Sequence, residues 1–404
     1  MKRLSRLIAR FCSRIVAWWN ALWFAVPHVQ RWNPAVGRKE DLQKLLDEVR
    51  QETGMPGVTV ALVHGDLIVS AASGELVLGE GSELRTDHRL HIGSVTKGFT
   101  ALLIAHMLDR GELSLESTMG ELLPEMDLHP NFRLVTIHQL LVNQAGLIGY
   151  HNSEAETVED LAFLEKELPK MNLSPGEERE SIARYFLNRA PFYEPGRRAL
   201  YSNVGWSLLG FIAERMSGES FESLLRKRIL QPLEMADVGI GGWPASTSDP
   251  EQPRGHYTEG NGYRPQPLDD PYRLQAWLNP AGGLHMTVQD LALYARDTLR
   301  GLRGEKALLA KRNYNLIHSV QLAVPVRELY PGMSSSATLR MGYGWALLET
   351  NRGTISAGEG SAGTFFASTM VFPYLNVAVV SITNCGDRKA SVQLIKKLTG
   401  IRWG

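Results

Sequence analysis

The chain has 404 residues, and its 43 Lys and Arg balance its 43 Asp and Glu, so the formal net charge is zero. This length allows one large or two modest globular units with a hydrophobic core. The absence of a basic excess argues against a nucleic-acid-binding protein. One of the two cysteines, Cys12, lies in the N-terminal segment, so we expect no disulfide inside the folded body, and cysteine usage does not define the compartment.

The first 27 residues have two contrasting helical faces. Leu, Ile, Phe and Trp side chains fill one side. The other side carries arginines at helical spacing, namely Arg3, Arg6, Arg10 and Arg14. A basic face backed by Trp and Leu is typical of a helix that lies in a membrane interface. Residues 1–36 are therefore predicted to be a membrane-associating segment followed by a linker.

Other interpretations of this segment stay open. Its uninterrupted apolar part, residues 15–27, is short for a bilayer span, and no clear cleavage site marks it as a signal peptide. A helix packed on the folded domain is the alternative to membrane association. We expect a bacterial inner-membrane protein that faces the periplasm, with the cytoplasmic face as the alternative. The sequence indicates no oligomeric state.

Residues 37–404 are expected to form one domain with strands at both ends and helices between them. A stripe of apolar residues at i, i+3, i+4 and i+7 follows Asp41 and predicts the first helix. Strands 58–63 and 67–71 come next, joined by a tight hairpin turn at His64-Gly65-Asp66. Helices are then predicted at 99–110, 137–141 and 206–216, strands at 343–349, 364–372 and 377–383, and a last helix at 389–398.

This order of elements favours an α/β fold. Strands from the two ends of the chain can share one antiparallel sheet sandwiched by helices, with a mostly α-helical lobe, about residues 96–300, inserted beside it. A groove between two such lobes is the place where we expect an active site.

The segment Ser94-Val95-Thr96-Lys97 carries the main chemical signal, as the one S-x-x-K in the chain. A serine hydroxyl is a poor nucleophile unless a base removes its proton. If a helix begins at about Ser94, Lys97 lies one turn further on the same face. The lysine can act as the base only if its pKa is well below the usual value of about 10.4. The alternative is an N-capping serine followed by a surface lysine.

A second signal is Tyr201-Ser202-Asn203. A phenol near a lysine and a serine can relay protons, and an Asn can donate to a substrate carbonyl. A competing copy stands at Tyr150-His151-Asn152. Tyr201 is preferred because it follows the turn Glu194-Pro195-Gly196 and opens an apolar helix, so that its side chain can be held at the edge of a cleft.

These segments resemble the serine β-lactamase and penicillin-binding-protein superfamily, and most closely its branch of class C β-lactamases, D-stereospecific peptidases and β-lactamase-like esterases. The resemblance covers about residues 40–400. It is carried by Gly93-Ser94-Val95-Thr96-Lys97, Pro195-Gly196, Tyr201-Ser202-Asn203, Pro232-Leu233-Glu234-Met235, Ala281-Gly282-Gly283-Leu284 and Gly342-Tyr343-Gly344-Trp345. It implies a β-lactamase/transpeptidase-like fold, with Ser94 as the acylated nucleophile, Lys97 and Tyr201 as the proton-shuttling pair, and Asn203 as a substrate-orienting group.

The family also has a strand motif, Lys- or His-x-Gly, whose cation binds a substrate carboxylate. Counting back from Phe372-Pro373 places it at Gly358-Glu359-Gly360, where the basic residue is absent. The shifted register that starts at Glu359 has no cation either. The resemblance still implies that Gly360 and the Ser361 N–H supply the backbone half of an oxyanion hole.

The missing cation, together with the charge of Glu359, is expected to disfavour anionic substrates. An esterase or acyltransferase acting on small-molecule esters or neutral amides is therefore ranked first. A β-lactamase or D-Ala-type peptidase that acts on cell-wall substrates is the alternative. A non-catalytic binding protein with the same fold is the alternative from another class.

Other motifs do not compete with this interpretation. The segment Glu359-Gly360-Ser361-Ala362-Gly363 nearly matches the nucleophile elbow G-x-S-x-G, but its first residue is Glu. The histidines do not recur at metal-ligand spacing, and His88 and His91 are a lone pair of the structural kind. We therefore expect no metal and no cofactor.

Overall fold

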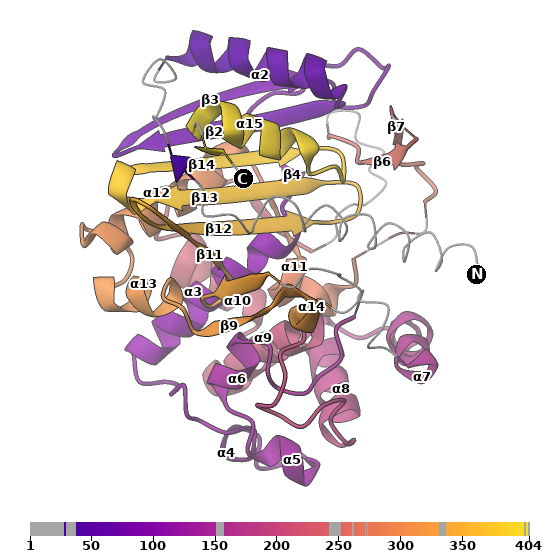
Figure 1. Ribbon diagram of the computed structural model, residues 1–404. Coiled ribbons are helices and arrows are strands. Elements are labelled where there is room, and N and C mark those ends of the chain that lie inside the picture. The colour runs from indigo at the N-terminus through magenta and orange to yellow at the C-terminus, as the bar shows by residue number, and fades with distance from the viewer. Residues whose placement is uncertain are drawn as a thin grey trace.

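The computed structural model describes residues 28–29, 38–150, 157–241, 252–260, 262–270, 272, 274–330, 337–399 and 401–402. Its centre is an eight-stranded antiparallel sheet in the order β3-β2-β14-β13-β12-β11-β10-β9 (Figure 1). The strands are β2 (Gly57–His64), β3 (Leu67–Gly74), β9 (Leu322–Pro325), β10 (Thr338–Met341), β11 (Ala346–Thr350), β12 (Gly353–Ser361), β13 (Phe366–Phe372) and β14 (Val377–Thr383). The two ends of the chain thus share one sheet, as expected.

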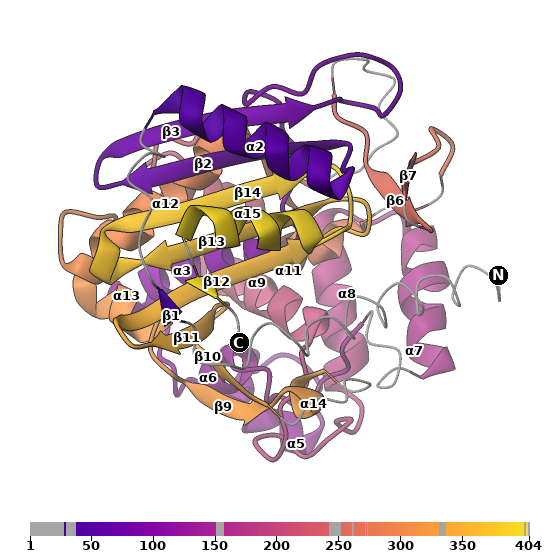
Figure 2. The ribbon, with the colours of Figure 1, turned by 45° about the horizontal axis from the view of Figure 1, so that its top comes forward.

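Helices cover both faces of this sheet. The first helix, α2 (Lys39–Thr53), and the last, α15 (Lys389–Thr399), lie side by side on one face (Figure 2). The long helix α12 (Val288–Arg303) packs on β14, β2 and β13 from the other face. Every residue of β13 and β14 is buried, because a strand with helices on both sides has no face left for solvent.

The region between β3 and β9 is mostly helical. Figure 1 shows most of its helices gathered on one side of the sheet. They include α3 (Thr96–Asp109), α4 (Met119–Leu122), α5 (Pro130–Arg133), α6 (Ile137–Leu141), α7 (Val158–Ala162), α8 (Pro175–Leu187), α9 (Asn203–Ser217), α10 (Phe221–Leu225), α11 (Asn279–Gly282) and α13 (Lys311–Ile317), with α14 (Val326–Leu329) after β9. One continuous cluster of buried apolar side chains joins these helices to the sheet.

Short strands interrupt this helical region. The sequence analysis did not predict these strands. Three of them, β4 (Leu90–His91), β8 (Leu284–Met286) and β5 (Val238–Ile240), form a small sheet, and its strand β4 directly precedes the S-x-x-K segment. Two others, β6 (His256–Glu259) and β7 (Gly262–Pro265), form a hairpin. Strands of two to four residues carry too little alternation to be recognised by periodicity.

Most of the predicted elements match the structure. The hairpin between β2 and β3 turns at Gly65, whose φ of 57° suits glycine. Of the predicted helix stripe in α2, Leu42, Leu46 and Val49 are buried and Leu45 is partly buried. The predicted strand 343–349 is wrong at its start, since β11 begins at Ala346. The reason is Gly344, whose φ of 76° makes a turn there.

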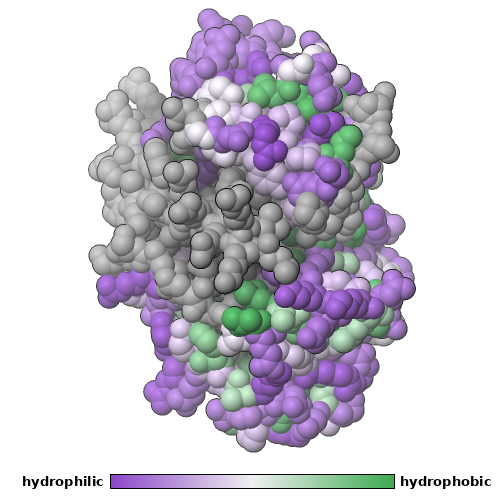
Figure 3. Space-filling view, turned by 90° about the vertical axis from the view of Figure 1, so that its right-hand side faces the viewer, coloured by the Kyte–Doolittle hydropathy of each residue, from purple (hydrophilic) through white to green (hydrophobic). Residues whose placement is uncertain are grey.

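The predicted membrane-associating segment, residues 1–36, lies outside the described residues except for β1 (His28–Val29), which pairs with β15 (Ile401–Arg402). Among the residues that the structure describes, none of the helices is long and apolar enough to span a membrane. On the face seen in Figure 3, hydrophilic side chains dominate, and hydrophobic side chains lie in small separate patches, one of them in the upper part of the view.

Candidate active site

Ser94 lies in a tight turn between a strand and a helix. Strand β4 leads into a 3-10 turn, Gly93–Val95, and α3 follows from Thr96. The helical turn begins at Gly93 and continues into α3, so Lys97 lies one turn after Ser94, as supposed for a helix that begins at about Ser94. Gly93 has a φ of 51°, and a Cβ there would lie 2.6 Å from the backbone of Ser361. Ser94 is partly exposed within a buried stretch.

The turn is supported by a histidine that the sequence analysis assigned to structure. His91 Nδ1 accepts a hydrogen bond of 2.9 Å from the Gly93 N–H. Burial lowers the pKa of His91 to about 3, so that the ring is neutral and keeps a lone pair for this bond. His91 therefore helps to hold the chain where it bends toward Ser94.

Lys97 is buried, with 2% of its surface exposed, and its amine contacts three oxygens. Its Nζ lies 3.1 Å from Ser94 Oγ, 2.8 Å from Asn203 Oδ1 and 2.6 Å from the carbonyl oxygen of Ala281. Burial lowers the pKa of the Lys97 amine well below its ordinary value. A neutral amine has two N–H bonds and one lone pair. The two carbonyl oxygens can accept the N–H groups, which leaves the lone pair for the Ser94 hydroxyl proton.

Tyr201 lies close to the same amine. The Lys97 Nζ is 4.7 Å from the centre of the Tyr201 ring. Burial raises the pKa of Tyr201, while a hydrogen bond with the Ser94 side chain partly offsets the rise. The ring stacks on Tyr330, with 5.2 Å between ring centres. The phenol is thus protonated at neutral pH and contacts the Ser94 hydroxyl.

Asn203 is held by a loop that includes the competing Tyr150. Its backbone N–H donates to Gly149 O and its Nδ2 to Tyr150 O, each at 2.8 Å, so that its Oδ1 points to Lys97. The neighbouring Ser202 caps α9 and donates to Ile148 O at 2.5 Å. Tyr150 therefore contributes a carbonyl, while its ring packs on Trp277. The residues of the competing motif after Tyr150 lie outside the described residues.

The end of β12 closes the site from the sheet side. A Cβ on Gly360 would lie 2.1 Å from Ile92 O and 2.4 Å from Ser94 N, so no side chain fits there. A Cβ on Gly93 would likewise be too close to the Ser361 backbone. In the described part of the chain, β11 pairs with β12 only between Gly353 and Ala357. The last four residues of β12 therefore present a free strand edge on the β11 side, next to Ser94.

The structure corrects the expected effect of Glu359. Its carboxylate is not an isolated negative charge, because Arg388 binds it with two hydrogen bonds, Nε to Oε2 at 2.7 Å and Nη2 to Oε1 at 2.9 Å. The two charges neutralise each other, so Glu359 does not repel anions as a single charge would. The sequence could not indicate this pair, since the partners are 29 residues apart.

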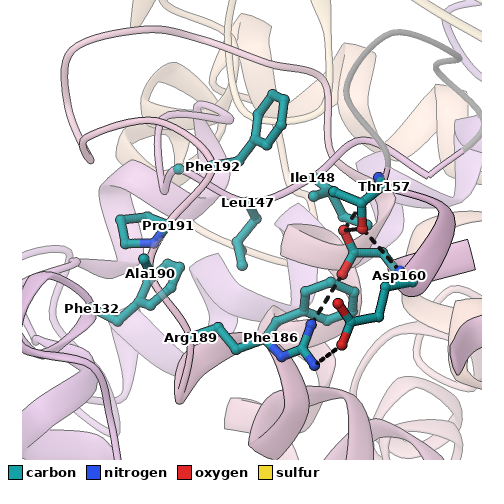
Figure 4. A pocket seen from close by; sticks show the side chains of 12 residues that line it. Phe132, Leu147, Ile148, Thr157, Asp160, Phe186, Arg189, Ala190, Pro191 and Phe192 are labelled. Atoms are coloured by element: carbon teal, nitrogen blue, oxygen red, sulfur yellow. Dashed lines mark hydrogen bonds and ion pairs between the residues drawn. The ribbon is translucent and has the colours of Figure 1, made fainter.

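A separate cavity of ≈ 190 Å³ lies behind the loop that carries the Asn203 contacts. Figure 4 shows apolar side chains, among them Leu147 and Phe186, around it, with Arg189 paired to acidic groups at one end. Ser94, Lys97 and Tyr201 are not among its lining residues. The cavity is therefore distinct from the surroundings of the serine.

The geometry joins a partly exposed serine, a buried lysine and a tyrosine, and comparison with known proteins identifies the family. The sequence model of the family described as beta-lactamase matches residues 42–398. The chain belongs to the beta-lactamase family. This beta-lactamase-family chain is a serine hydrolase, which the names of its relatives also support.

Three relatives that carry different names are similar in sequence to this chain. "Penicillin-binding protein 4" of Amycolatopsis lactamdurans is 26% identical over 387 residues, which cover 89% of this chain and 90% of that protein. "Esterase EstB" of Burkholderia gladioli is 28% identical, over 56% of each chain. "Beta-lactamase" of Escherichia coli (strain K12) is 24% identical, over 62% of this chain and 59% of that one.

Solved structures confirm the α/β fold with its antiparallel sheet. The octameric penicillin-binding protein homologue from Pyrococcus abyssi superimposes with a TM-score of 0.69 at 24% identity, over 89% of this chain and 77% of that chain. The structure of SurE gives the same TM-score at 21% identity, over 90% and 76%.

Three contributors to the site were missed by sequence reasoning. The Ala281 carbonyl lies in a segment that the resemblance had noted, without a role for it. Tyr330 and Arg388 lie in segments to which no motif was assigned. A backbone carbonyl leaves no signature in the sequence, and a stacked ring or a paired arginine is recognised only once the elements are placed in space.

Proposed function

We propose that Ser94 is the acylated nucleophile of a carboxylic-ester hydrolase or acyltransferase. The observation that carries this proposal is the buried Lys97 amine, 3.1 Å from Ser94 Oγ and with its pKa lowered by burial. A lysine that is neutral at physiological pH can act as a general base.

The proton path follows from the contacts. Lys97 accepts the Ser94 hydroxyl proton while Oγ forms a bond to the acyl carbon. Tyr201 donates its proton to the leaving-group oxygen as the carbon–oxygen bond breaks, and it is reprotonated from Lys97. A water molecule, or an acceptor alcohol in acyl transfer, then attacks the acyl-enzyme and gives its proton to the same pair. Ser94 regains its hydroxyl as the product leaves.

Two backbone N–H groups are proposed to stabilise the oxyanion that forms. They belong to Ser94 and Ser361, whose segments touch where Gly360 leaves no room for a side chain. One such donor contributes about 3–4 kcal/mol of transition-state stabilisation. Asn203, held on three sides, is proposed to orient Lys97 and the substrate.

An ester is proposed ahead of an anionic substrate because the strand motif carries no basic residue at Gly358, and Arg388 is bound to Glu359. The esterase name of one relative agrees with this choice. The alternative, a β-lactam or cell-wall peptide, is favoured by the relative named as a penicillin-binding protein, which matches over 90% of its length.

The test is covalent labelling of the purified full-length chain. We expect a fluorophosphonate to label the wild type, Ser94→Ala to remain unlabelled, and Ser114→Ala, a change at an exposed serine, to be labelled like the wild type. An activated ester should give a burst of one equivalent of leaving group. Absence of both the label and the burst in a folded wild type would refute the proposal. Efficient capture of a fluorescent penicillin would favour the alternative substrate class.

Residues 1–27 are proposed to hold the protein at a membrane surface, at the periplasmic side of a bacterial inner membrane. The support is the basic and apolar pattern of that segment. We expect the full chain to sediment with anionic lipid vesicles and a chain that starts at residue 37 to remain in the supernatant. Equal behaviour of the two chains would contradict this proposal.

A further inference from the structure

The ion pair between Glu359 and Arg388 is nearly buried, and Glu359 directly precedes Gly360, which contacts the Ser94 turn. Glu359 is in β12, and Arg388 follows β14 just before α15. The side chains of Arg388 and Glu359 are 10% and 9% exposed, and both guanidinium–carboxylate hydrogen bonds are short. A two-point contact of this kind uses the guanidinium geometry that also binds a free carboxylate.

The pair lies at the free edge of β12. Its neighbour Gly360 is packed against the Ser94 N–H, and the pairing of β11 with β12 ends at Ala357 within the described residues. A substrate that is acylated at Ser94 and extends along this edge therefore passes Glu359. Side chains along a strand alternate between its two faces. Gly358 and Gly360 face the Ser94 side of the sheet, so the Glu359 side chain points to the opposite face, where Ile355 and Ala357 pack with α2 and α15.

Tyr330 connects this pair to the proposed proton shuttle. Its ring stacks on Tyr201. Its pKa is raised by burial first, and also by electrostatic interaction with the Tyr201 phenol group and the Glu359 carboxylate. Tyr330, which stacks on Tyr201, is therefore within electrostatic reach of the Glu359 carboxylate.

We infer that Glu359 acts as an internal carboxylate that occupies Arg388 and thereby makes the enzyme selective for acyl substrates without a negative charge at this edge. The inference rests on the proposed function and names its substrate class. A tethered carboxylate competes with a substrate carboxylate at a high effective concentration. A neutral ester does not need Arg388 and is unaffected by this competition.

The inference is tested with matched pairs of substrates. The p-nitrophenyl hydrogen esters of succinic, glutaric and adipic acid carry a carboxylate at three spacings, and their methyl esters are the neutral partners. The measured quantity is the ratio of kcat/KM for the acid to kcat/KM for its methyl ester. We expect Glu359→Ser to raise this ratio by about ten- to a hundredfold for at least one spacing, the range of one charged hydrogen bond.

Arg388 provides the matched control. The double variant Glu359→Ser/Arg388→Ser lacks the guanidinium and should return the ratio to the wild-type value. The gain in the single variant should appear mainly as a lower KM for the acid. A gain of the same size in the double variant would overturn the inference, because the arginine would then not be its source.

The outcomes separate this inference from the proposed function. If the wild type hydrolyses the methyl esters and is labelled at Ser94, but a folded Glu359→Ser shows an unchanged ratio at all three spacings, the inference is overturned and the proposed function stands. If the wild type shows neither hydrolysis nor labelling, the proposed function itself fails. Should Glu359→Ser not fold in thermal denaturation, Glu359→Gln decides by the same ratio, with an increase expected and an unchanged value overturning the inference.

Discussion

The substitution Gly360→Ala tests whether the contact between β12 and the Ser94 turn sets the geometry of the site. The added Cβ would lie 2.1 Å from Ile92 O, whereas real Cβ atoms essentially never come closer than 3.0 Å. The strand end and the turn must therefore separate by roughly 0.9 Å, and both are backbone. Misplacement of reacting groups by about 1 Å can lower activity about a hundredfold, and overpacking costs about 1–3 kcal/mol of stability.

The assay is pre-steady-state hydrolysis of a p-nitrophenyl ester, together with thermal unfolding. We expect the acylation rate of Gly360→Ala to fall by about a hundredfold, with the fold retained. Gly358→Ala is the matched control, because it lies on the same face of the same strand and its Cβ would meet the Trp345 ring at 3.5 Å, an ordinary contact. Wild-type acylation and melting temperature in Gly360→Ala would refute the reasoning.

Two further predictions concern buried titratable groups. Lys97→Met should abolish acylation yet raise the melting temperature at pH 7. The folded state lowers the Lys97 pKa, so at pH 7 the amine must lose a proton when the chain folds, which lowers the stability of the wild type. An unchanged or lower melting temperature of the variant would contradict this. His256 Nε2 accepts a hydrogen bond from the Leu78 N–H and its Nδ1–H donates to Asn384 O, and burial lowers the pKa of His256 to about 4. The unfolded chain therefore binds a proton that the folded chain does not between about pH 6.5 and 4. Stability should fall with acidity across this window, and His256→Gln should reduce the slope of unfolding free energy against pH by up to about 1.4 kcal/mol per unit; the same slope in both proteins would exclude this role.

Local sequence patterns were sufficient to predict much of the fold. The stripe in α2, the hairpin turn at Gly65 and the strands near the C-terminus depend on periodicity and on turn residues, which act over a few positions. The spacing of Ser94 and Lys97 belongs to this class, because one helical turn brings them together whatever surrounds them. Tyr201 was preferred over Tyr150 from its local turn, and the structure places Tyr201 at the Lys97 amine.

The contacts between residues far apart in the sequence could not be predicted from local patterns. The Ala281 carbonyl that accepts from Lys97 is 184 residues away in the chain, and Arg388 reaches Glu359 only because β13 and β14 return the chain beside β12. Charge alone suggested that Glu359 would repel anions, whereas the charge of Arg388 cancels that of Glu359. A sequence therefore determines the type and spacing of the reactive groups, since these are local. Which oxygen accepts each proton, and which charge cancels which, is decided by the tertiary structure, because those contacts depend on the order in which distant strands and helices pack.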